Sequence, residues 1–166
     1  MNKKPLLFLT IISSLIMITG CSTPIYHLDE NVTNASSSVN YEIFVASFYD
    51  SNNDGVGDLK GVELKLDYLQ KLGVKNLWLM PIHPSQSYHK YNVDNYYGID
   101  SSYGTMEDFE SLVTKAKEKN IGILIDLVMN HSSNLHPWFI QSIEDVRTNN
   151  YGEGSKANYY IWKDCF

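Results

Sequence analysis

The sequence predicts an α/β protein built on a parallel β-sheet. Three apolar runs of strand length lie at residues 41–48, 75–82 and 121–128. Two segments with helical periodicity separate these runs, and crossover helices are the usual connection between parallel strands. Near-continuous apolar strands are typical of parallel sheets covered on both faces, so we expect such a sheet here. The alternation of elements fits both an open, doubly wound sheet and a closed barrel.

The composition describes a mildly acidic globular protein. Of the 166 residues, 43% are hydrophobic and 19% are charged, and the formal net charge is −6. A basic surface for nucleic acid is not predicted, because Arg147 is the only arginine and the lysines are dispersed. No glycine-rich phosphate-binding motif follows a predicted strand, which argues against a nucleotide-binding protein.

The first 20 residues resemble a bacterial lipoprotein signal peptide. Lys3 and Lys4 form a basic start, an apolar stretch follows over residues 6–18, and the segment closes with Gly20 and Cys21. The apolar stretch is shorter than the roughly 20 residues that a membrane span needs. This order predicts that a lipid attached to Cys21 anchors the protein on the extracytoplasmic face of the cell membrane. An uncleaved anchor helix is the alternative.

Residues 21–40 are polar and weakly patterned, which is typical of a flexible tether. The folded domain should therefore begin near Tyr41. Because Cys21 is assigned to the lipid, Cys165 has no cysteine partner, and we expect no disulfide.

The predicted helices have recognisable ends. The first helix covers residues 59–72 and stops at Gly73, and its apolar face consists of Val62, Leu66 and Leu69. The second helix begins after Thr105, where Asp108 completes a capping box. Asn120 stands where a left-handed C-terminal residue is expected. The predicted buried stripe of this second helix consists of Met106, Phe109, Leu112, Val113 and Ala116.

A loop with regularly spaced oxygen ligands separates the first predicted strand from the first helix. Gly55 allows a tight turn, and the twelfth position of the loop is Gly61 rather than an acid. Calcium prefers hard oxygen ligands at such alternate positions, so we expect a structural Ca²⁺ site. The predicted ligands are the side chains of Asp50, Asn52, Asp54 and Asp58 and the carbonyl of Val56. The same residues also suit an Asx-turn loop without an ion.

Several ordered motifs resemble the alpha-amylase family of glycoside hydrolases. The matching segments are residues 50–58, 77–82, 87–91, 103–109 and 126–131, the last of which fits the family's D-x-V-x-N-H signature. The resemblance implies the N-terminal portion of a (β/α)8 TIM barrel, an α/β fold. Residues 41–130 would form the first three βα units, about three of the eight strands. Residues 131–166 would begin an inserted B domain that is truncated at Phe166.

The resemblance also implies site residues. Tyr91 matches the family tyrosine that stacks under the sugar at the cleavage subsite, and His131 matches the histidine that hydrogen-bonds a hydroxyl of that sugar. Asp126 and Asn130 match strand-end residues that hold the geometry of the site, and His89 would face the same cleft. Without the motif, His131 would suit a satisfied core position, and His89 an exposed loop position.

The implied function is retaining hydrolysis of α-glucans, such as starch and maltodextrins, by a surface-anchored enzyme. This reaction needs two carboxyl groups about 5 Å apart, which the family carries on later strands. The family's fourth-strand signature contains an arginine, and Arg147 does not stand in such a motif. We therefore expect these residues alone to be inactive. A non-catalytic glucan- or calcium-binding lipoprotein, or a decayed gene product, is the alternative.

Overall fold

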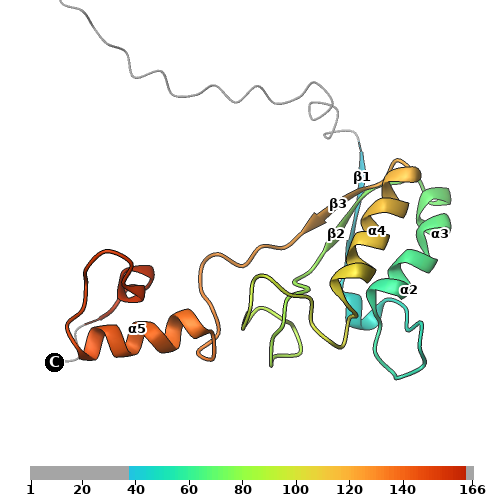
Figure 1. Ribbon diagram of the computed structural model, residues 1–166. Helices are drawn as coiled ribbons and strands as arrows, with labels where there is room; N and C mark the ends of the chain where they lie inside the picture. The colour runs from blue at the N-terminus through green and yellow to red at the C-terminus, as the bar shows by residue number, and fades with distance from the viewer. Residues whose placement is uncertain (1–37, 164–166) are drawn as a thin grey trace, which may run out of the picture. The chain divides into compact units, whose positions relative to one another are not determined.

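The computed structural model describes residues 38–163, and Figure 1 shows how their helices and strands are arranged. The predicted signal peptide over residues 1–20, the lipidation site Cys21, most of the predicted tether over residues 21–40, and Cys165 lie outside the described residues. Among the residues that are described, none of the helices has the length and apolar character needed to cross a bilayer.

The sheet consists of three parallel strands that follow one another in sequence order. They are β1 (Val39–Ile43), β2 (Val74–Leu79) and β3 (Gly122–Ile125). The pairing of β2 with β3 is regular, whereas the pairing of β1 with β2 shifts register after Val39. The predicted parallel sheet is therefore confirmed.

Helices connect the strands on one side of the sheet. The first connection contains α2 (Leu59–Leu64) and α3 (Leu66–Lys71), and the second contains α4 (Met106–Glu118). All three helices lie on the same side (Figure 1). Sequential strand order with crossovers on one side is the arrangement that builds a barrel, whereas a doubly wound sheet places helices on both faces.

The first strand differs from the strand predicted over residues 41–48. It begins at Val39 and ends at Ile43, and the 3-10 turn η2 (Val45–Ser47) follows it. The backbone N–H of Gly57 donates to the carbonyl of Ala46 at 2.8 Å, so this segment bonds to the loop instead of to a neighbouring strand. The second and third strands are likewise shorter than predicted and end at Leu79 and Ile125.

The helix predicted over residues 59–72 is interrupted. Lys65 has φ −97° and ψ 3°, which lie outside the helical region, and it separates α2 from α3. Gly73 follows α3 with φ +87°, and Asn120 follows α4 with φ +56°. Both residues therefore adopt the left-handed conformation common after a helix, which confirms Gly73 as the stop and the left-handed conformation predicted for Asn120.

Helix α4 begins with the predicted capping box of Thr105 and Asp108. Its predicted buried stripe is only partly correct, because the fully buried members are Leu112 and Ala116. Met106 is 41% exposed and Val113 is 37% exposed. Val113 lines an open hollow beside β3, and no helix or strand of the described part of the chain covers this hollow.

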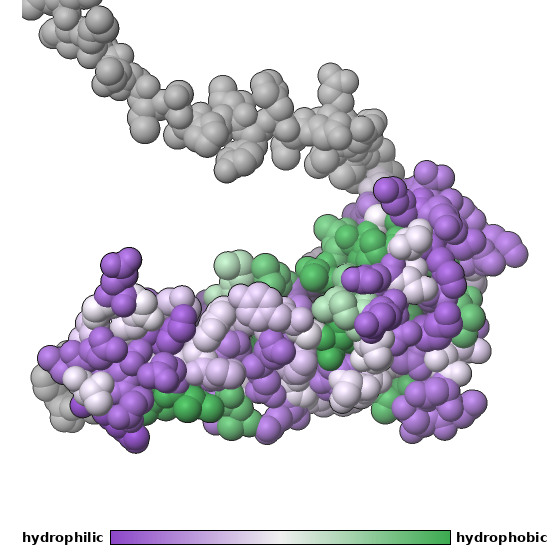
Figure 2. All heavy atoms as spheres, in the orientation of Figure 1, coloured by the Kyte–Doolittle hydropathy of each residue, from purple (hydrophilic) through white to green (hydrophobic). Residues whose placement is uncertain are grey.

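The hydrophobic core lies between the sheet and the helices. Leu77 and Leu79 of β2 are fully buried there, whereas Trp78 points to the opposite face and is 44% exposed. Leu124, which pairs with Trp78 across the sheet, is 52% exposed. Figure 2 shows hydrophobic surface on the part of the molecule that carries the sheet. The prediction of a sheet covered on both faces is therefore wrong for the described residues.

A buried carboxylate joins α2 to α4. The side chain of Glu63 is 3% exposed and accepts hydrogen bonds from Lys60 Nζ, Lys115 Nζ and Ser111 Oγ, each at 2.6 Å. Burial alone would raise the pKa of this carboxyl, but the bonds from Lys115, Lys60 and Ser111 outweigh burial and lower the pKa to about 2. Glu63 is therefore ionised in the folded protein at neutral pH.

The chain after β3 contains α5 (Pro137–Arg147) and the 3-10 helix η3 (Lys156–Tyr159). Asp145 joins these elements, because its carboxylate accepts four hydrogen bonds from within the segment. The donors are Gln141 Nε2, Asn150 Nδ2, Ser155 Oγ and Lys156 N. These bonds hold the pKa of Asp145 below its ordinary value, the bond from Gln141 having the largest effect.

Candidate functional site

Polar and aromatic side chains gather at the C-terminal end of the sheet. Tyr91 lies in the long loop after β2, and Asp126 directly follows β3. The backbone N–H of Asp126 donates to the carbonyl of Leu79 at 2.9 Å, so Asp126 continues the sheet pairing by one residue. Because the ends of parallel strands meet at one edge, side chains from distant parts of the chain come together here.

Tyr91 and Asp126 are directly hydrogen-bonded. The Tyr91 hydroxyl donates to Asp126 Oδ2 at 2.6 Å. This hydrogen bond, together with burial, raises the pKa of Tyr91 to about 12. The hydroxyl therefore stays protonated at neutral pH, and its bond to Asp126 holds the outer end of the Tyr91 ring, which is only partly buried.

His131 lies beside Tyr91 as well. His131 Nε2 is 3.1 Å from the Tyr91 carbonyl oxygen. Because a carbonyl can only accept, Nε2 carries the proton, and Nδ1 of a neutral His131 ring is then an acceptor. Asn130 Nδ2 lies 3.5 Å from that Nδ1. Both Asn130 and His131 are exposed.

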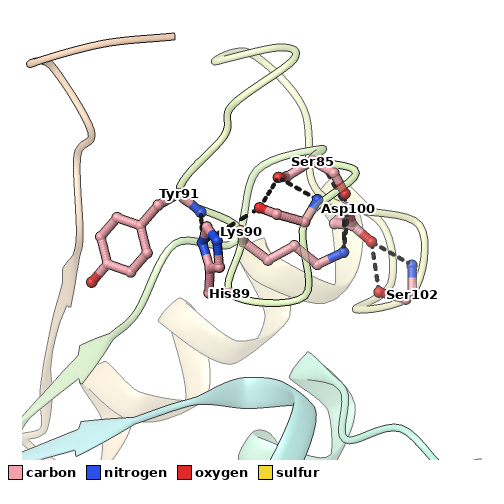
Figure 3. Close-up of polar contacts among 7 residues, drawn as sticks. Ser85, His89, Lys90, Tyr91, Asp100 and Ser102 are labelled. Atoms are coloured by element: carbon pink, nitrogen blue, oxygen red, sulfur yellow. Dashed lines mark hydrogen bonds and ion pairs between the residues drawn. The ribbon is translucent and has the colours of Figure 1, made fainter. Parts of the chain in front are cut away.

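His89 completes this group of residues. Its Nδ1 accepts a hydrogen bond from the Tyr91 backbone N–H at 3.1 Å, and the two ring centroids are 5.8 Å apart. Figure 3 shows His89 and Tyr91 side by side. All five side chains that sequence reasoning places at a sugar site are thus linked, and we call them the strand-end cluster. It consists of His89, Tyr91, Asp126, Asn130 and His131. Their roles toward a ligand stay predictions.

Tyr96 connects the two loops that carry the cluster. Its hydroxyl lies 2.8 Å from the carbonyl oxygens of both Val128 and His131, and its ring stacks on Trp138 with centroids 5.8 Å apart. Burial raises the pKa of Tyr96, so the hydroxyl remains a donor. Sequence reasoning assigns no role to Tyr96, because a tyrosine-rich loop does not reveal which hydroxyl reaches another loop.

Lys90 and Asp100 form a second connection that sequence reasoning misses. Lys90 Nζ lies 2.7 Å from Asp100 Oδ2, and both side chains are nearly buried. The one sequence signal is the position of Lys90 between His89 and Tyr91. A single lysine between two site residues usually indicates an exposed side chain, so this signal alone does not predict a buried ion pair.

The loop predicted to bind calcium is closed by its own hydrogen bonds. Asp50, Asn52 and Asp54 each accept, through a side-chain oxygen, the backbone N–H two residues further on, at 3.1, 2.9 and 2.8 Å. Asp50 Oδ2 also accepts from the N–H of Gly55, and this bond is the largest cause of the lowered pKa of Asp50. The loop therefore has Asx-turn geometry.

The fourth predicted side-chain ligand, Asp58, is buried. Its Oδ1 accepts from Gly61 N at 2.6 Å, which caps α2, and its Oδ2 accepts from Ser51 N and Oγ. Within residues 38–163, no group of three His, Cys, Asp or Glu side chains is arranged to hold a metal ion. Asp50, Asp54 and Asp58 thus do not form a carboxylate site by themselves, and a calcium ion here would also need Asn52 and the Val56 carbonyl as ligands.

The charge of this loop fits a cation. None of the ion pairs in the described part of the chain involves Asp50, Asp54 or Asp58. Three carboxylates and an amide oxygen are hard donors of the kind that calcium takes. The donor set thus fits calcium in its chemistry, and the same residues also form the observed Asx turns.

Comparisons with known proteins identify the family. Residues 42–165 match the family model described as alpha amylase, catalytic domain. Alpha-amylase 3 of Dictyoglomus thermophilum is 47% identical over 161 residues, which cover 96% of this chain and 29% of that relative. The glucan 1,6-alpha-glucosidase of Streptococcus pneumoniae is 42% identical over 129 residues, which cover 77% of this chain and 23% of that relative.

Solved structures share the fold. The crystal structure of an alpha-amylase from H. orenii superimposes with a TM-score of 0.69 at 47% identity, over 77% of this chain and 27% of that one. The chain thus spans less than a third of the length of the relatives it matches, and its three strands and their helices are a portion of a TIM barrel. Since the catalytic-domain model matches most of the sequence, including every residue of the strand-end cluster, this chain belongs to the alpha-amylase family of glycoside hydrolases.

Proposed function

We propose that this chain supplies the sugar-binding side of a glycoside hydrolase that cleaves α-glucans by retaining hydrolysis. The observation that carries the proposal is the strand-end cluster, where an aromatic ring, an imidazole and a carboxylate meet at the C-terminal edge of the sheet. Barrel enzymes bind their ligands at that edge. The relatives are named for alpha-amylase and glucan 1,6-alpha-glucosidase activity, which supports starch, maltodextrins and related oligosaccharides as the substrate class.

Each residue of the cluster has a distinct part in this proposal. The Tyr91 ring stacks against the apolar face of a glucose unit, and its bond to Asp126 keeps the ring in place before the sugar arrives. His131 Nε2 donates to a sugar hydroxyl in exchange for its bond to the Tyr91 carbonyl. Asn130 and His89 border the same surface and supply further polar contacts.

Bond cleavage needs a nucleophile and a general acid/base about 5 Å apart. In the strand-end cluster, Asp126 is the only carboxylate, and the Tyr91 hydroxyl engages it. We therefore propose that the 166 residues bind maltooligosaccharides without cleaving them. Release of reducing sugar from starch by the purified chain would contradict this. The same assay, repeated on a longer chain with further family motifs, separates an enzyme from a non-catalytic glucan-binding lipoprotein.

Replacing Tyr91 with alanine is expected to weaken maltooligosaccharide binding about tenfold, equivalent to about 1.4 kcal/mol, because the stacking surface is lost. Isothermal titration calorimetry on the chain measures this change. Tyr68→Ala is the matched control, since Tyr68 lies on α3 and is 55% exposed. Equal affinities for the wild type and the Tyr91 variant would refute the stacking role.

We propose a structural Ca²⁺ in the loop of residues 50–58, held by Asp50, Asn52, Asp54, Asp58 and the Val56 carbonyl. An ion bound only to the folded state raises Tm, here by a few degrees. Replacing Asp54 with alanine is expected to abolish the difference in Tm between calcium and chelator, whereas Asp67→Asn on α3 should keep it. The proposal fails if calcium leaves the Tm of the wild type unchanged.

We also propose that a lipid on Cys21 anchors the protein to the extracytoplasmic face of the cell membrane. The support is the order of basic start, apolar stretch, Gly20 and Cys21 in the sequence. In a bacterial host, Cys21→Ser is expected to lose labelled palmitate and to leave the membrane fraction. Cys165→Ser should behave as the wild type does. Undiminished labelling of the Cys21 variant would rule the anchor out.

A further inference from the structure

We infer that Lys90 is a positioning residue whose ion pair with Asp100 anchors the turn that presents His89 and Tyr91 to the ligand. The inference rests on the proposed sugar-binding role of Tyr91. Three features of the structure carry it: the backbone conformation of Lys90, the burial of its ion pair, and the attachment of Asp100 to the buried segment that follows β2.

The backbone at Lys90 is in an unfavourable conformation. Its φ of +62° lies in the left-handed region, which residues with a Cβ rarely adopt. In this turn, Lys90 N donates to the Ser87 carbonyl at 3.1 Å and Tyr91 N donates to His89 Nδ1 at 3.1 Å. His89 and Tyr91 therefore lie on one side, while the Lys90 side chain runs the opposite way (Figure 3). Such a turn persists only where surrounding contacts hold it.

The ion pair between Lys90 and Asp100 is one of those contacts. Lys90 Nζ lies 2.7 Å from Asp100 Oδ2 and 3.3 Å from the Ser85 carbonyl oxygen, and it sits 5.3 Å from the centre of the Tyr103 ring. The two charged side chains are only 12% and 9% exposed. Solvent screens such a pair little, and a neutral side chain at position 90 would leave Asp100 without its cation.

Asp100 is itself fixed to the body of the protein. Its Oδ1 accepts from Ser102 N and Oγ at 3.0 and 2.6 Å, and its Oδ2 accepts from Ser85 N at 3.2 Å. Its backbone N–H donates to the carbonyl of buried Ile82 at 2.9 Å. Burial opposes ionisation of Asp100, but the bonds from Lys90 and Ser102 prevail and lower its pKa. The anchor therefore stays charged at neutral pH.

Lys90 affects the ligand indirectly, through His89 and Tyr91. Because the amine of Lys90 points away from His89 and Tyr91, it acts on the ligand only through the position of these neighbours (Figure 3). Loss of the pair releases the left-handed turn, and the Tyr91 ring then leaves the position in which its hydroxyl reaches Asp126. Lys90 is thus expected to affect affinity without touching the sugar.

The test compares Lys90→Gln, Asp100→Asn, the double variant and Lys90→Gly with the wild-type chain. Nuclear Overhauser contacts between the rings of His89 and Tyr91 report the turn, and calorimetry with maltooligosaccharides reports binding. Both Gln and Asn variants are expected to lose the ring contact and about tenfold in affinity. The double variant should lose no more than either single variant, because the two residues act as one unit. Lys119→Gln, which breaks the Lys119–Asp67 ion pair elsewhere, should change neither measurement.

Lys90→Gly separates the ion pair from the backbone. Glycine adopts positive φ without strain, so the left-handed backbone at position 90 stays favourable in this variant. What the variant loses is the side chain that pairs with Asp100. Loss of the ring contact in Lys90→Gly supports the inference, and wild-type behaviour overturns it. If the glutamine variant does not fold, Lys90→Gly still tests whether the ion pair holds the turn. If the wild type shows the ring contact but binds no maltooligosaccharide, the proposed function fails. The role of Lys90 in holding the turn is then tested by the ring contact alone.

Discussion

Replacing Gly61 with alanine is expected to destabilise the chain by roughly 3 kcal/mol or more. A Cβ at this position would lie 1.9 Å from the carbonyl oxygen of Tyr49 and 2.8 Å from its carbonyl carbon. These are backbone atoms, so no side-chain rotation relieves the clash. Either the start of α2 or the loop before it must move, and the cap from Asp58 Oδ1 to Gly61 N is disturbed in both cases.

Urea unfolding of the purified chain measures this loss of stability. Gly152→Ala is the matched control, because a Cβ at position 152 meets no atom nearer than Asn150 Oδ1 at 3.7 Å. The control is expected to change the free energy of unfolding by less than about 0.5 kcal/mol. If the two alanine variants unfold at the same urea concentration, the close approach of Gly61 to Tyr49 is not a constraint on the fold.

Replacing Glu63 with glutamine is expected to lower the free energy of unfolding at neutral pH by about 2 kcal/mol. The pKa of this carboxyl falls from 4.5 to about 2 on folding, and each pKa unit is equivalent to about 1.4 kcal/mol. The full shift would correspond to about 3 kcal/mol, but Lys60 and Lys115 are about half exposed, and solvent reduces their effect.

The pH dependence gives a sharper test of Glu63. Because folding lowers the pKa, the stabilisation is fully present above pH 4.5 and is lost as the pH falls from 4.5 toward 2. The glutamine variant should lose less stability over this range than the wild type does. Asp67→Asn, which breaks the more exposed pair with Lys119, should retain most of the wild-type slope. Parallel curves for wild type and Glu63→Gln would exclude the predicted linkage.

Local sequence patterns predict the elements because caps and apolar spacing act between near neighbours. The Thr105 and Asp108 box and the left-handed Asn120 are both found where the pattern places them. Element ends are less predictable, since they depend on partners distant in sequence. The apolar residues after Ile43 suit a strand equally well, and the bond from Gly57 to Ala46 bends them into a turn instead.

The same limit applies to burial. The spacing of Val113 on α4 suits a core position, but a pattern does not reveal whether another element covers that side of the helix. Likewise, the apolar character of Trp78 and Leu124 predicts coverage of both sheet faces. In the described residues the helices cover one face, and these two side chains remain exposed on the other.

The candidate site shows what family resemblance adds. It selects the five residues of the strand-end cluster, which the fold then brings into contact. It assigns no role to Lys90 or Tyr96, because their contacts depend on the paths of two long loops. For Gly61, the sequence shows only that an expected acid is missing. The structure supplies the reason, since any side chain there would collide with Tyr49.

The hydrogen bonds to Asp145 have a consequence for the order in which parts of the chain fold. All four donors lie between residues 141 and 156, so this piece closes on itself over a short stretch of sequence. The sheet, by contrast, must bring together strands from residue 39 to residue 125. Closing a short loop costs less chain entropy than closing a long one, and contacts between residues close in sequence form faster. The polypeptide around α5 is therefore expected to gain protection from hydrogen exchange before the sheet does during refolding.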